Sequence, residues 1–382
     1  MSHLNAEQER DFLSRGFSRR TFGRIATLLG AGAASLPFYN EPAMAQLSMV
    51  GSVPPDAVLI NANENPLGPC PEALEVMYGV LRNGGRYMFD KSFELSRTLA
   101  ETEGLPASHV RAFAGSSDPL HRSVLAFTSP LKSYVVADPG YEAGETAARF
   151  IGAKVVRVPL TKSHAHDVRA MAAADPNAGL IYVCNPNNPT GTTTSRGDIE
   201  WLLANKPAGC VVLLDEAYIH FSSDAPCCDL AGSGKDIIVL RTFSKLYGMA
   251  GIRAGVAIGR PDLISRLSAY GNGMMPVAGM AGAIASLQVK NLVSERRKLM
   301  AAIRNDLFEF LDKHKFTFVP SDSNKFMLDT KRPGHEFVRA MAAEKVFVGR
   351  VWPSWPTHVR VTIGTKDEMA KFRTALLKVM QA

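Results

Sequence analysis

The sequence contains few cysteines, and they lack the spacing of metal ligands. Five thiols, an odd number, do not form the regular framework of a disulfide-rich domain. Adjacent Cys227 and Cys228 do not make half of a zinc site, so no metal ion is predicted. We interpret the thiols as structural, and a redox pair at Cys227 and Cys228 stays open. The full set is Cys70, Cys184, Cys210, Cys227 and Cys228.

A dense basic stripe is missing as well. The formal charge of +7 arises from 43 basic and 36 acidic residues, without a Lys/Arg run interleaved with aromatics. Nucleic acid is therefore not predicted as a partner. The 46% hydrophobic and 21% charged residues are typical of a soluble globular protein. A chain of 382 residues is long enough for two unequal lobes.

The N-terminus has the three parts of an export signal. Residues 18–22 read Ser-Arg-Arg-Thr-Phe, a small-residue apolar run covers 25–38, and Ala-Met-Ala at 43–45 resembles a cleavage site. The run is too short and too rich in Ala and Gly to predict a stable membrane span. We predict a signal peptide over residues 1–45, recognised by the twin-arginine export machinery, and a periplasmic location. If the Arg-Arg pair is fortuitous and the signal unused, the protein is cytoplasmic.

Short apolar runs alternate with helical patterns between residues 80 and 290, which indicates a mainly parallel sheet between helices. We predict a large α/β domain over 80–290 and a smaller α+β domain over 291–382, which residues 46–79 join. The predicted strands of the large domain are 134–138, 154–158, 180–184, 210–215, 237–241 and 254–258. Those of the small domain are 316–319, 326–329, 346–349 and 359–363, after a long helical pattern that follows Pro276 and runs through 294–313.

A lysine follows one of the predicted buried strands. Residues 241–245 read Arg-Thr-Phe-Ser-Lys, and an unpaired ammonium at the end of such a strand is costly to desolvate. Condensation of Lys245 with the aldehyde of pyridoxal 5′-phosphate (PLP), as a Schiff base, removes this cost. Thr242, Ser244 and Arg253 could then hold the cofactor phosphate. The alternative is a lysine in an exposed loop.

An acidic residue ends the preceding strand. In residues 211–218 the run Val-Val-Leu-Leu is followed by Asp215, and a carboxylate there requires a cationic partner. A protonated pyridine nitrogen is such a partner and keeps the ring an electron sink. Tyr218 could donate to the cofactor 3′-oxygen. A magnesium ligand is the alternative, but no G-x-x-x-x-G-K-[ST] motif accompanies Asp215.

A third motif follows another strand. Residues 185–191 read Asn-Pro-Asn-Asn-Pro-Thr-Gly, which predicts a rigid turn at the strand end. Asn188 in this turn is a second candidate donor to the 3′-oxygen. A turn without a functional role is the alternative.

Taken together, the three motifs resemble the class I/II aminotransferases of PLP fold type I, and most closely their histidinol-phosphate aminotransferase-like branch. The resemblance covers nearly the whole chain after residue 45. It begins at residues 61–68, Asn-Ala-Asn-Glu-Asn-Pro-Leu-Gly, which is similar to the opening motif of the branch. It ends at 359–365, Val-Arg-Val-Thr-Ile-Gly-Thr, which is similar to its carboxylate-binding strand.

The resemblance implies further cofactor contacts. Ser116 and Ser117, in Gly-Ser-Ser-Asp at 115–118, resemble the turn that binds the phosphate at a helix N-terminus. Tyr141 is similar to the aromatic residue that stacks on the pyridine ring. Tyr87 is similar to the tyrosine that a neighbouring subunit lends to the phosphate, which implies a homodimer. For both tyrosines, simple core packing is the alternative.

The resemblance also assigns a substrate side to the site. Arg360 is similar to the anchor of the substrate carboxylate, Arg350 is a second candidate anion anchor, and Asn63 lies in the opening motif. Two positions depart from the branch. This chain has Met88 where the branch usually has proline, and Asp118 where it usually has glutamate. These departures leave histidinol phosphate open as the substrate.

The prediction for function is a PLP-dependent aminotransferase. It would move an amino group between an amino acid, or a related amine, and a 2-oxo acid, with Lys245 as the catalytic base. A PLP-dependent lyase or oxidase on the same scaffold is the alternative, because these enzymes share Lys245 and Asp215. A second alternative is that the chain is a noncatalytic PLP-binding protein rather than an enzyme, and release of an oxo acid would exclude it.

Overall fold

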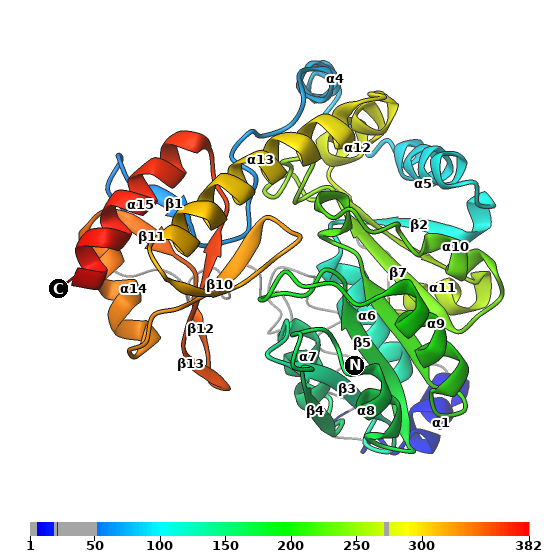
Figure 1. Cartoon of the computed structure of the whole chain (residues 1–382). Coiled ribbons are helices and arrows are strands. Elements are labelled where there is room, and N and C mark those ends of the chain that lie inside the picture. Colours follow the sequence, from blue (N-terminus) through cyan, green and yellow to red (C-terminus); the bar gives the residue numbers. More distant parts are fainter. Residues whose placement is uncertain (1–5, 19–20, 22–51, 271–274, 382) are drawn as a thin grey trace.

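The computed structural model describes residues 6–18, 21, 52–270 and 275–381, and these form a large and a small domain (Figure 1). The large domain surrounds a seven-stranded sheet in the order β2-β8-β7-β6-β5-β3-β4. Five neighbouring strands from β4 to β7 are parallel, and β8 runs antiparallel to both of its neighbours. The strands are β2 (Val110–Phe113), β3 (Ser133–Asp138), β4 (Val155–Pro159), β5 (Ala178–Cys184), β6 (Val211–Asp215), β7 (Ile237–Thr242) and β8 (Gly255–Gly259).

Helices cover both faces of this sheet, so its central strands are buried throughout. Every residue of β5, β6 and β7 is buried, which explains why these strands read as continuous apolar runs rather than as alternating ones. The helices are α4 (Pro71–Leu81), α5 (Asp90–Glu103), α6 (Ser117–Phe127), α7 (Ala143–Phe150), α8 (Val168–Ala173), α9 (Arg196–Asn205), α10 (Cys228–Gly232), α11 (Pro261–Ser268) and α12 (Val277–Gln288), with short 3₁₀ turns η2 (Ala107–His109) and η3 (Ile219–Phe221).

The small domain combines two sheets with three helices. The antiparallel sheet has the order β12-β13-β10-β9, and β1 pairs in parallel with β11. Its elements are β1 (Val58–Ile60), α13 (Leu292–Lys313), β9 (Thr317–Val319), β10 (Lys325–Asp329), α14 (Gly334–Ala343), β11 (Val346–Val348), β12 (Val351–Trp352), β13 (Trp355–Thr362) and α15 (Lys366–Gln381). The predicted fold class, a mainly parallel α/β domain with a smaller α+β domain, is confirmed.

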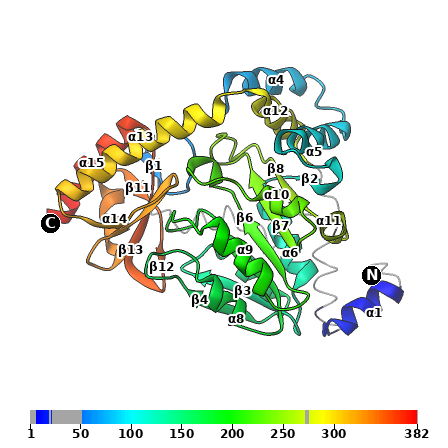
Figure 2. The same ribbon diagram turned by 45° about the vertical axis from the view of Figure 1, so that its right-hand side comes forward.

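The helical pattern after Pro276 folds as two helices. Val289, directly after α12, is extended with φ −81° and ψ 102°, and α13 starts three residues later at Leu292. The break allows α12 to lie buried beside α4 and α5 while α13 crosses to the small domain (Figure 2). Periodicity does not register this change of direction, because both helices are apolar on the buried face.

The segment before the twin-arginine motif contacts the large domain. Helix α1 (Ala6–Ser14) is followed by Phe17, which is 3% exposed and belongs to the main hydrophobic cluster. Arg15 donates through Nη2 to the backbone oxygens of Leu125 and Thr128, at the end of α6. Arg19 and Arg20, the apolar run and the cleavage site of the predicted signal lie outside the described residues.

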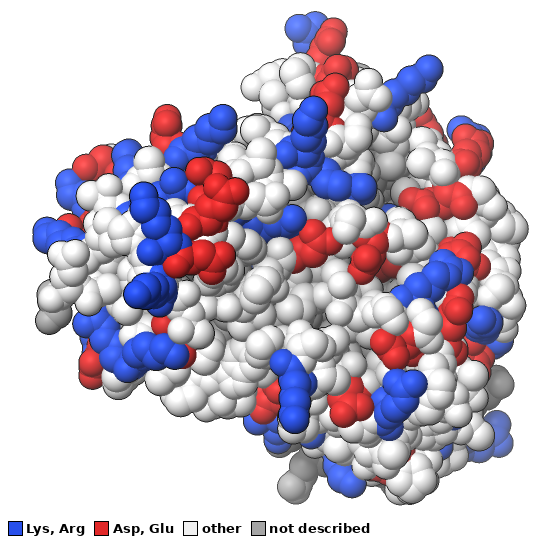
Figure 3. Space-filling view, in the orientation of Figure 1, with Lys and Arg blue, Asp and Glu red and all other residues white. Residues whose placement is uncertain are grey.

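Within the described ranges, no helix combines the length and the apolar character that crossing a membrane requires. The surface in Figure 3 shows Lys and Arg interspersed with Asp and Glu over the visible face.

Candidate active site

A cavity of about 320 Å³ lies at the carboxyl ends of β5, β6 and β7, where ligands bind in open α/β sheets. Residues of both domains line it. Among the predicted site residues, the cavity brings together Asn63, Ser116, Ser117, Tyr141, Asn188, Asp215, Tyr218, Ser244, Lys245, Arg253, Arg350 and Arg360. Thr242 and Tyr87 are not among its lining residues.

Lys245 lies in the turn after β7, directly behind the buried strand that positions it. Its Nζ is 5.7 Å from the centroid of the Tyr218 ring. Thr242 stabilises this turn. Its hydroxyl donates to Ser244 Oγ at 2.9 Å and accepts from the Ser244 N–H at 3.1 Å. Thr242 therefore orients Ser244 rather than facing the cavity.

One end of the cavity is built for an anion. Ser117 begins α6, and Ser116 is its N-cap residue, so backbone N–H groups and the helix dipole point at the same space. Arg253 completes this end and donates through Nη1 to Ser244 Oγ at 3.1 Å. Gly115 has φ +89°, a left-handed conformation that favours glycine, and a Cβ there would lie 2.2 Å from Arg253 Nη2 and force this guanidinium to move.

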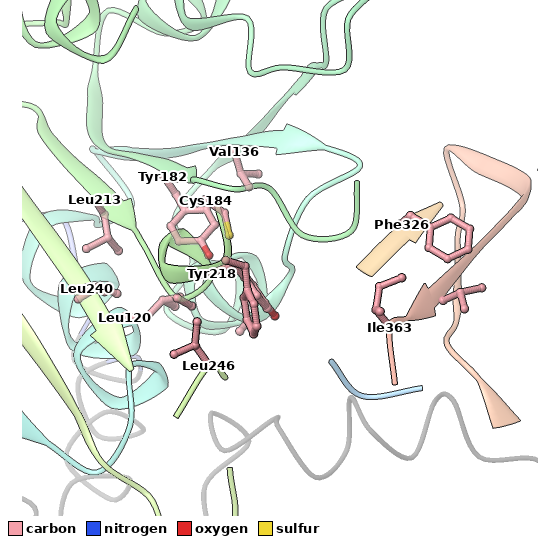
Figure 4. Close-up of a cluster of buried hydrophobic side chains, with 14 of the residues drawn as sticks. Leu120, Val136, Tyr182, Cys184, Leu213, Tyr218, Leu240, Leu246, Phe326 and Ile363 are labelled. Atoms are coloured by element: carbon pink, nitrogen blue, oxygen red, sulfur yellow. The ribbon is translucent and has the colours of Figure 1, made fainter. Parts of the chain in front are cut away.

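Asp215, the last residue of β6, is held from the neighbouring strand. Tyr182 of β5 donates its hydroxyl to Asp215 Oδ2 at 2.8 Å, and the Ala217 N–H donates to Oδ1 at 3.1 Å. Burial, helped by the charge of Asp215, holds the pKa of Tyr182 well above its ordinary value, so the phenol remains a donor. Figure 4 shows Tyr182 beside Cys184 and Tyr218 in this buried cluster.

Asn63, Asn188 and Tyr218 form a hydrogen-bonded group with Arg360. Asn63 Nδ2 donates to the Tyr218 hydroxyl at 3.1 Å, and Arg360 Nη1 donates to Asn188 Oδ1 at 3.0 Å. Arg360 Nη2 donates to the backbone oxygen of Asn61 at 2.6 Å. These acceptors are neutral, and Arg360 forms no ion pair with any described residue. Burial and the nearby Arg350 lower the pKa of Arg360 to about 10, so it remains a cation at neutral pH.

Arg350 has a different environment. It forms an ion pair with Glu142, the residue that precedes α7, and its guanidinium lies 4.4 Å from the centroid of the Trp352 ring. Trp352 is 1% exposed and is not among the residues that line the cavity, so it packs inside the protein beside the two arginines. Trp355 likewise packs on His164 and His358.

Lys325, at the start of β10, is a buried lysine that was not predicted from the sequence. It is fully buried, donates to Ser323 Oγ at 3.0 Å, and its Nζ lies 3.1 Å from the centroid of the Tyr218 ring. Burial lowers the pKa of Lys325 well below its ordinary value. The sequence contains one signal for this residue, because Lys325 is followed directly by the apolar residues Phe-Met-Leu.

Tyr87 lies outside this arrangement. Its side chain is 62% exposed, and its ring stacks on Phe89 with centroids 5.2 Å apart. Core packing, the alternative considered for this tyrosine, does not apply. Tyr87 therefore does not contribute to the cavity of its own chain.

The five cysteines are free and buried. Burial raises the pKa of Cys227 to about 12, and Cys228 Sγ donates to Glu103 Oε2 at 2.8 Å. Both thiols are therefore protonated and poorly reactive at neutral pH, which supports the structural interpretation over a redox pair. The described residues contain no group of three or more His, Cys, Asp or Glu that could hold a metal ion.

The donor set of the cavity fits PLP. The serines of α6 and Arg253 form an anion cradle for a phosphate, and Lys245 supplies the amine. Asp215 is an acceptor for a protonated ring nitrogen, and Tyr141 contributes an aromatic face.

Comparisons with known proteins agree with this geometry. Residues 56–376 match the family described as aminotransferase class I and II. The chain is 33% identical over 335 residues to histidinol-phosphate aminotransferase 1 of Nitrosococcus oceani, which covers 85% of this chain and 89% of that protein. It is 34% identical over 329 residues to the aromatic amino acid aminotransferase of Nocardia farcinica, with 83% and 90% covered. The solved histidinol-phosphate aminotransferase of Sinorhizobium meliloti, in complex with pyridoxal-5′-phosphate, has a TM-score of 0.79 at 25% identity and covers 91% of this chain and 96% of that one.

Two lysines near one cavity, Lys245 partly exposed and Lys325 fully buried, allow a sharp test of the cofactor attachment. Borohydride treatment of the PLP-loaded protein should fix a pyridoxyl group on Lys245 and not on Lys325, because only Lys245 lines the cavity. Peptide mass spectrometry locates the adduct. The adduct should disappear in Lys245→Ala and persist in the matched control Lys325→Met. A pyridoxyl group on Lys325 in the wild-type protein would contradict the assignment.

Proposed function

We propose that this chain, which belongs to the aminotransferase class I and II family and is a PLP-dependent aminotransferase, takes its amino group from an α-amino acid held at Arg360 and passes it to a 2-oxo acid. One observation carries the proposal: Lys245 and Arg360 line the same cavity, and the Arg360 guanidinium is bonded to neutral acceptors. Its charge is therefore available for the carboxylate that both substrates share.

The residues of the chain divide the work. PLP supplies, when bound, an aldehyde for amines and a ring that accepts electrons from the substrate. The Ser116–Ser117 end with Arg253 would hold the phosphate, and Asp215 would hold the ring nitrogen, fixed in place by Tyr182. The Lys245 amine would remove the proton at the substrate Cα and return it to the carbon on the other side of the substrate nitrogen, while Arg360 would orient the Cα–H bond toward that amine.

Substitutions of Lys245 and Arg360 should affect different steps, the chemical step for Lys245 and substrate binding for Arg360. Lys245→Ala should reduce amino transfer to background, because the base is lost. Arg360→Met should raise the amino acid KM by about 10–100-fold, the worth of a charge-assisted hydrogen bond. Both are measured by mass spectrometry of the newly formed amino and oxo acids. Arg196→Met, which removes an exposed partner of Asp229, is the control. Full turnover by Lys245→Ala would refute the proposal.

The enzyme is further proposed to act as a homodimer. Large apolar side chains on α4, on α5 and on the segment between them are exposed by 61–75%, which is unusual for the surface of a monomer. These residues are Tyr78, Leu81, Tyr87, Phe89 and Phe93. A second copy of the chain would cover them and would place Tyr87 where its hydroxyl reaches the partner's cofactor phosphate, as the family resemblance implies.

Light scattering tests the dimer. The wild-type protein should have twice the mass of the 41.4 kDa chain, and Tyr78→Glu/Phe93→Glu should be monomeric, because burying two carboxylates unpaired is too costly. Leu131→Glu, at a residue that is 61% exposed elsewhere on the surface, should remain dimeric. A monomeric wild-type protein would overturn this assignment.

Export by the twin-arginine route to the periplasm is the proposed location. Its support is the order of motif, apolar run and cleavage site in residues 18–45. That route carries folded proteins, which suits an enzyme that must bind its cofactor first.

The export proposal depends on Arg19 and Arg20. Arg19→Lys/Arg20→Lys should retain the full-length protein in the cytoplasm, whereas the wild type should appear in the periplasmic fraction. Immunoblotting of cell fractions distinguishes the two. Equal cytoplasmic retention of both proteins would indicate that the signal is not used.

A further inference from the structure

Arg350 and Arg360 lie next to each other in the cavity, but their guanidinium groups have different partners. The Arg360 N–H donates to the Arg350 backbone oxygen at 3.2 Å, so the pairing of adjacent strands fixes the two residues side by side. Both guanidinium groups lie over the Trp352 ring, at 4.4 Å for Arg350 and 5.5 Å for Arg360. Arg360 faces neutral acceptors, whereas Arg350 is paired with the carboxylate of Glu142.

The position of Glu142 is fixed from both domains. It directly precedes α7 and follows Tyr141, which lines the cavity. From the small domain, Trp352 Nε1 donates to the Gly140 backbone oxygen at 2.8 Å. Ser354 Oγ donates to Asp138 Oδ1, also at 2.8 Å. These contacts hold the segment with Glu142 against the segment with Arg350, so the ion pair is part of the closed arrangement of the domains.

The ion pair carries a cost that depends on the substrate. Glu142 is partly buried, with 26% of its side chain exposed, and this burial raises the pKa of its carboxyl while Arg350 opposes that rise. A substrate with an anionic side chain would have to displace Glu142 from Arg350 and leave this partly buried carboxylate unpaired beside a second negative charge. A substrate with an uncharged side chain leaves the pair intact.

We propose that Glu142 is a specificity-determining residue: by occupying Arg350 it selects against amino donors with anionic side chains, so that the enzyme acts on α-amino acids with uncharged side chains. This inference rests on the proposed function, because it concerns the side-chain part of the same cavity. Selectivity then comes from a repulsive element built into the protein, in addition to the attraction at Arg360. The competing explanation is that the pair only links the two domains.

Glutamate and glutamine make the test sharp, because they are nearly isosteric and differ in side-chain charge. In the holoenzyme, Glu142→Gln should raise kcat/KM for glutamate about tenfold or more, mainly through KM, while glutamine changes by less than about threefold. Glu142→Gln/Arg350→Met should lose the gain for glutamate. Glu145→Gln, in the first turn of α7 and paired with Arg149 and Arg157, is the matched control and should leave the glutamate-to-glutamine ratio unchanged.

A binding measurement separates this inference from the proposed function. Glutarate and its monoamide resemble the two donors without the amino group, so calorimetry reports their affinity in the absence of turnover. Glutarate should bind Glu142→Gln about tenfold more tightly than the wild type, and the monoamide about equally. If the affinities for both ligands are unchanged, or fall together, Glu142 is a domain link and the inference is overturned. The proposed function fails if the wild type transfers an amino group from no α-amino acid, while the binding data still decide the role of Glu142.

Discussion

The cavity between the domains gathers more positive than negative side chains, and its architecture depends on how this excess is balanced. Lys245, Arg253, Arg350 and Arg360 line it, whereas Asp215 and Glu64 are its acidic lining residues. Cations so close together are costly to bury unless anions join them. An anionic cofactor and carboxylate substrates provide that compensation, so the protein is electrostatically completed by what it binds.

The surroundings of the cavity are correspondingly rigid. Tyr182 fixes Asp215, Thr242 fixes Ser244, and Arg241, in the same strand as Thr242, pairs with the buried Glu216 at 2.6 Å. Each of these contacts is made by a side chain on β5, β6 or β7 or immediately after it. The reacting groups are therefore supported by fully buried strands, which reduces the reorganisation needed when a substrate binds.

Most of the site could be predicted because its residues follow recognisable strands. Lys245, Asp215 and Asn188 each come after a buried run, and parallel strands bring such ends to one edge of the sheet. Tyr182, Lys325 and Glu142 could not be found in this way. Tyr182 and Lys325 lie inside strands that read as apolar, and the Glu142–Arg350 pair joins residues 208 positions apart. The roles of Tyr182 and Glu142 come from tertiary contacts that no local pattern encodes, whereas Lys325 is marked only by its place at the start of an apolar run. Likewise, the break between α12 and α13 follows from packing against two different neighbours.

The attachment of Phe17 and Arg15 to the large domain has a consequence for maturation. If processing removes residues 1–45, a core aromatic ring leaves the main cluster, and the backbone oxygen of Thr128 loses the guanidinium that satisfies it. Tyr270 also loses its partner Arg15, although its own hydroxyl still donates to Leu125. The processed enzyme would then keep the same cavity but have a lower free energy of unfolding than the precursor, because it lacks these contacts.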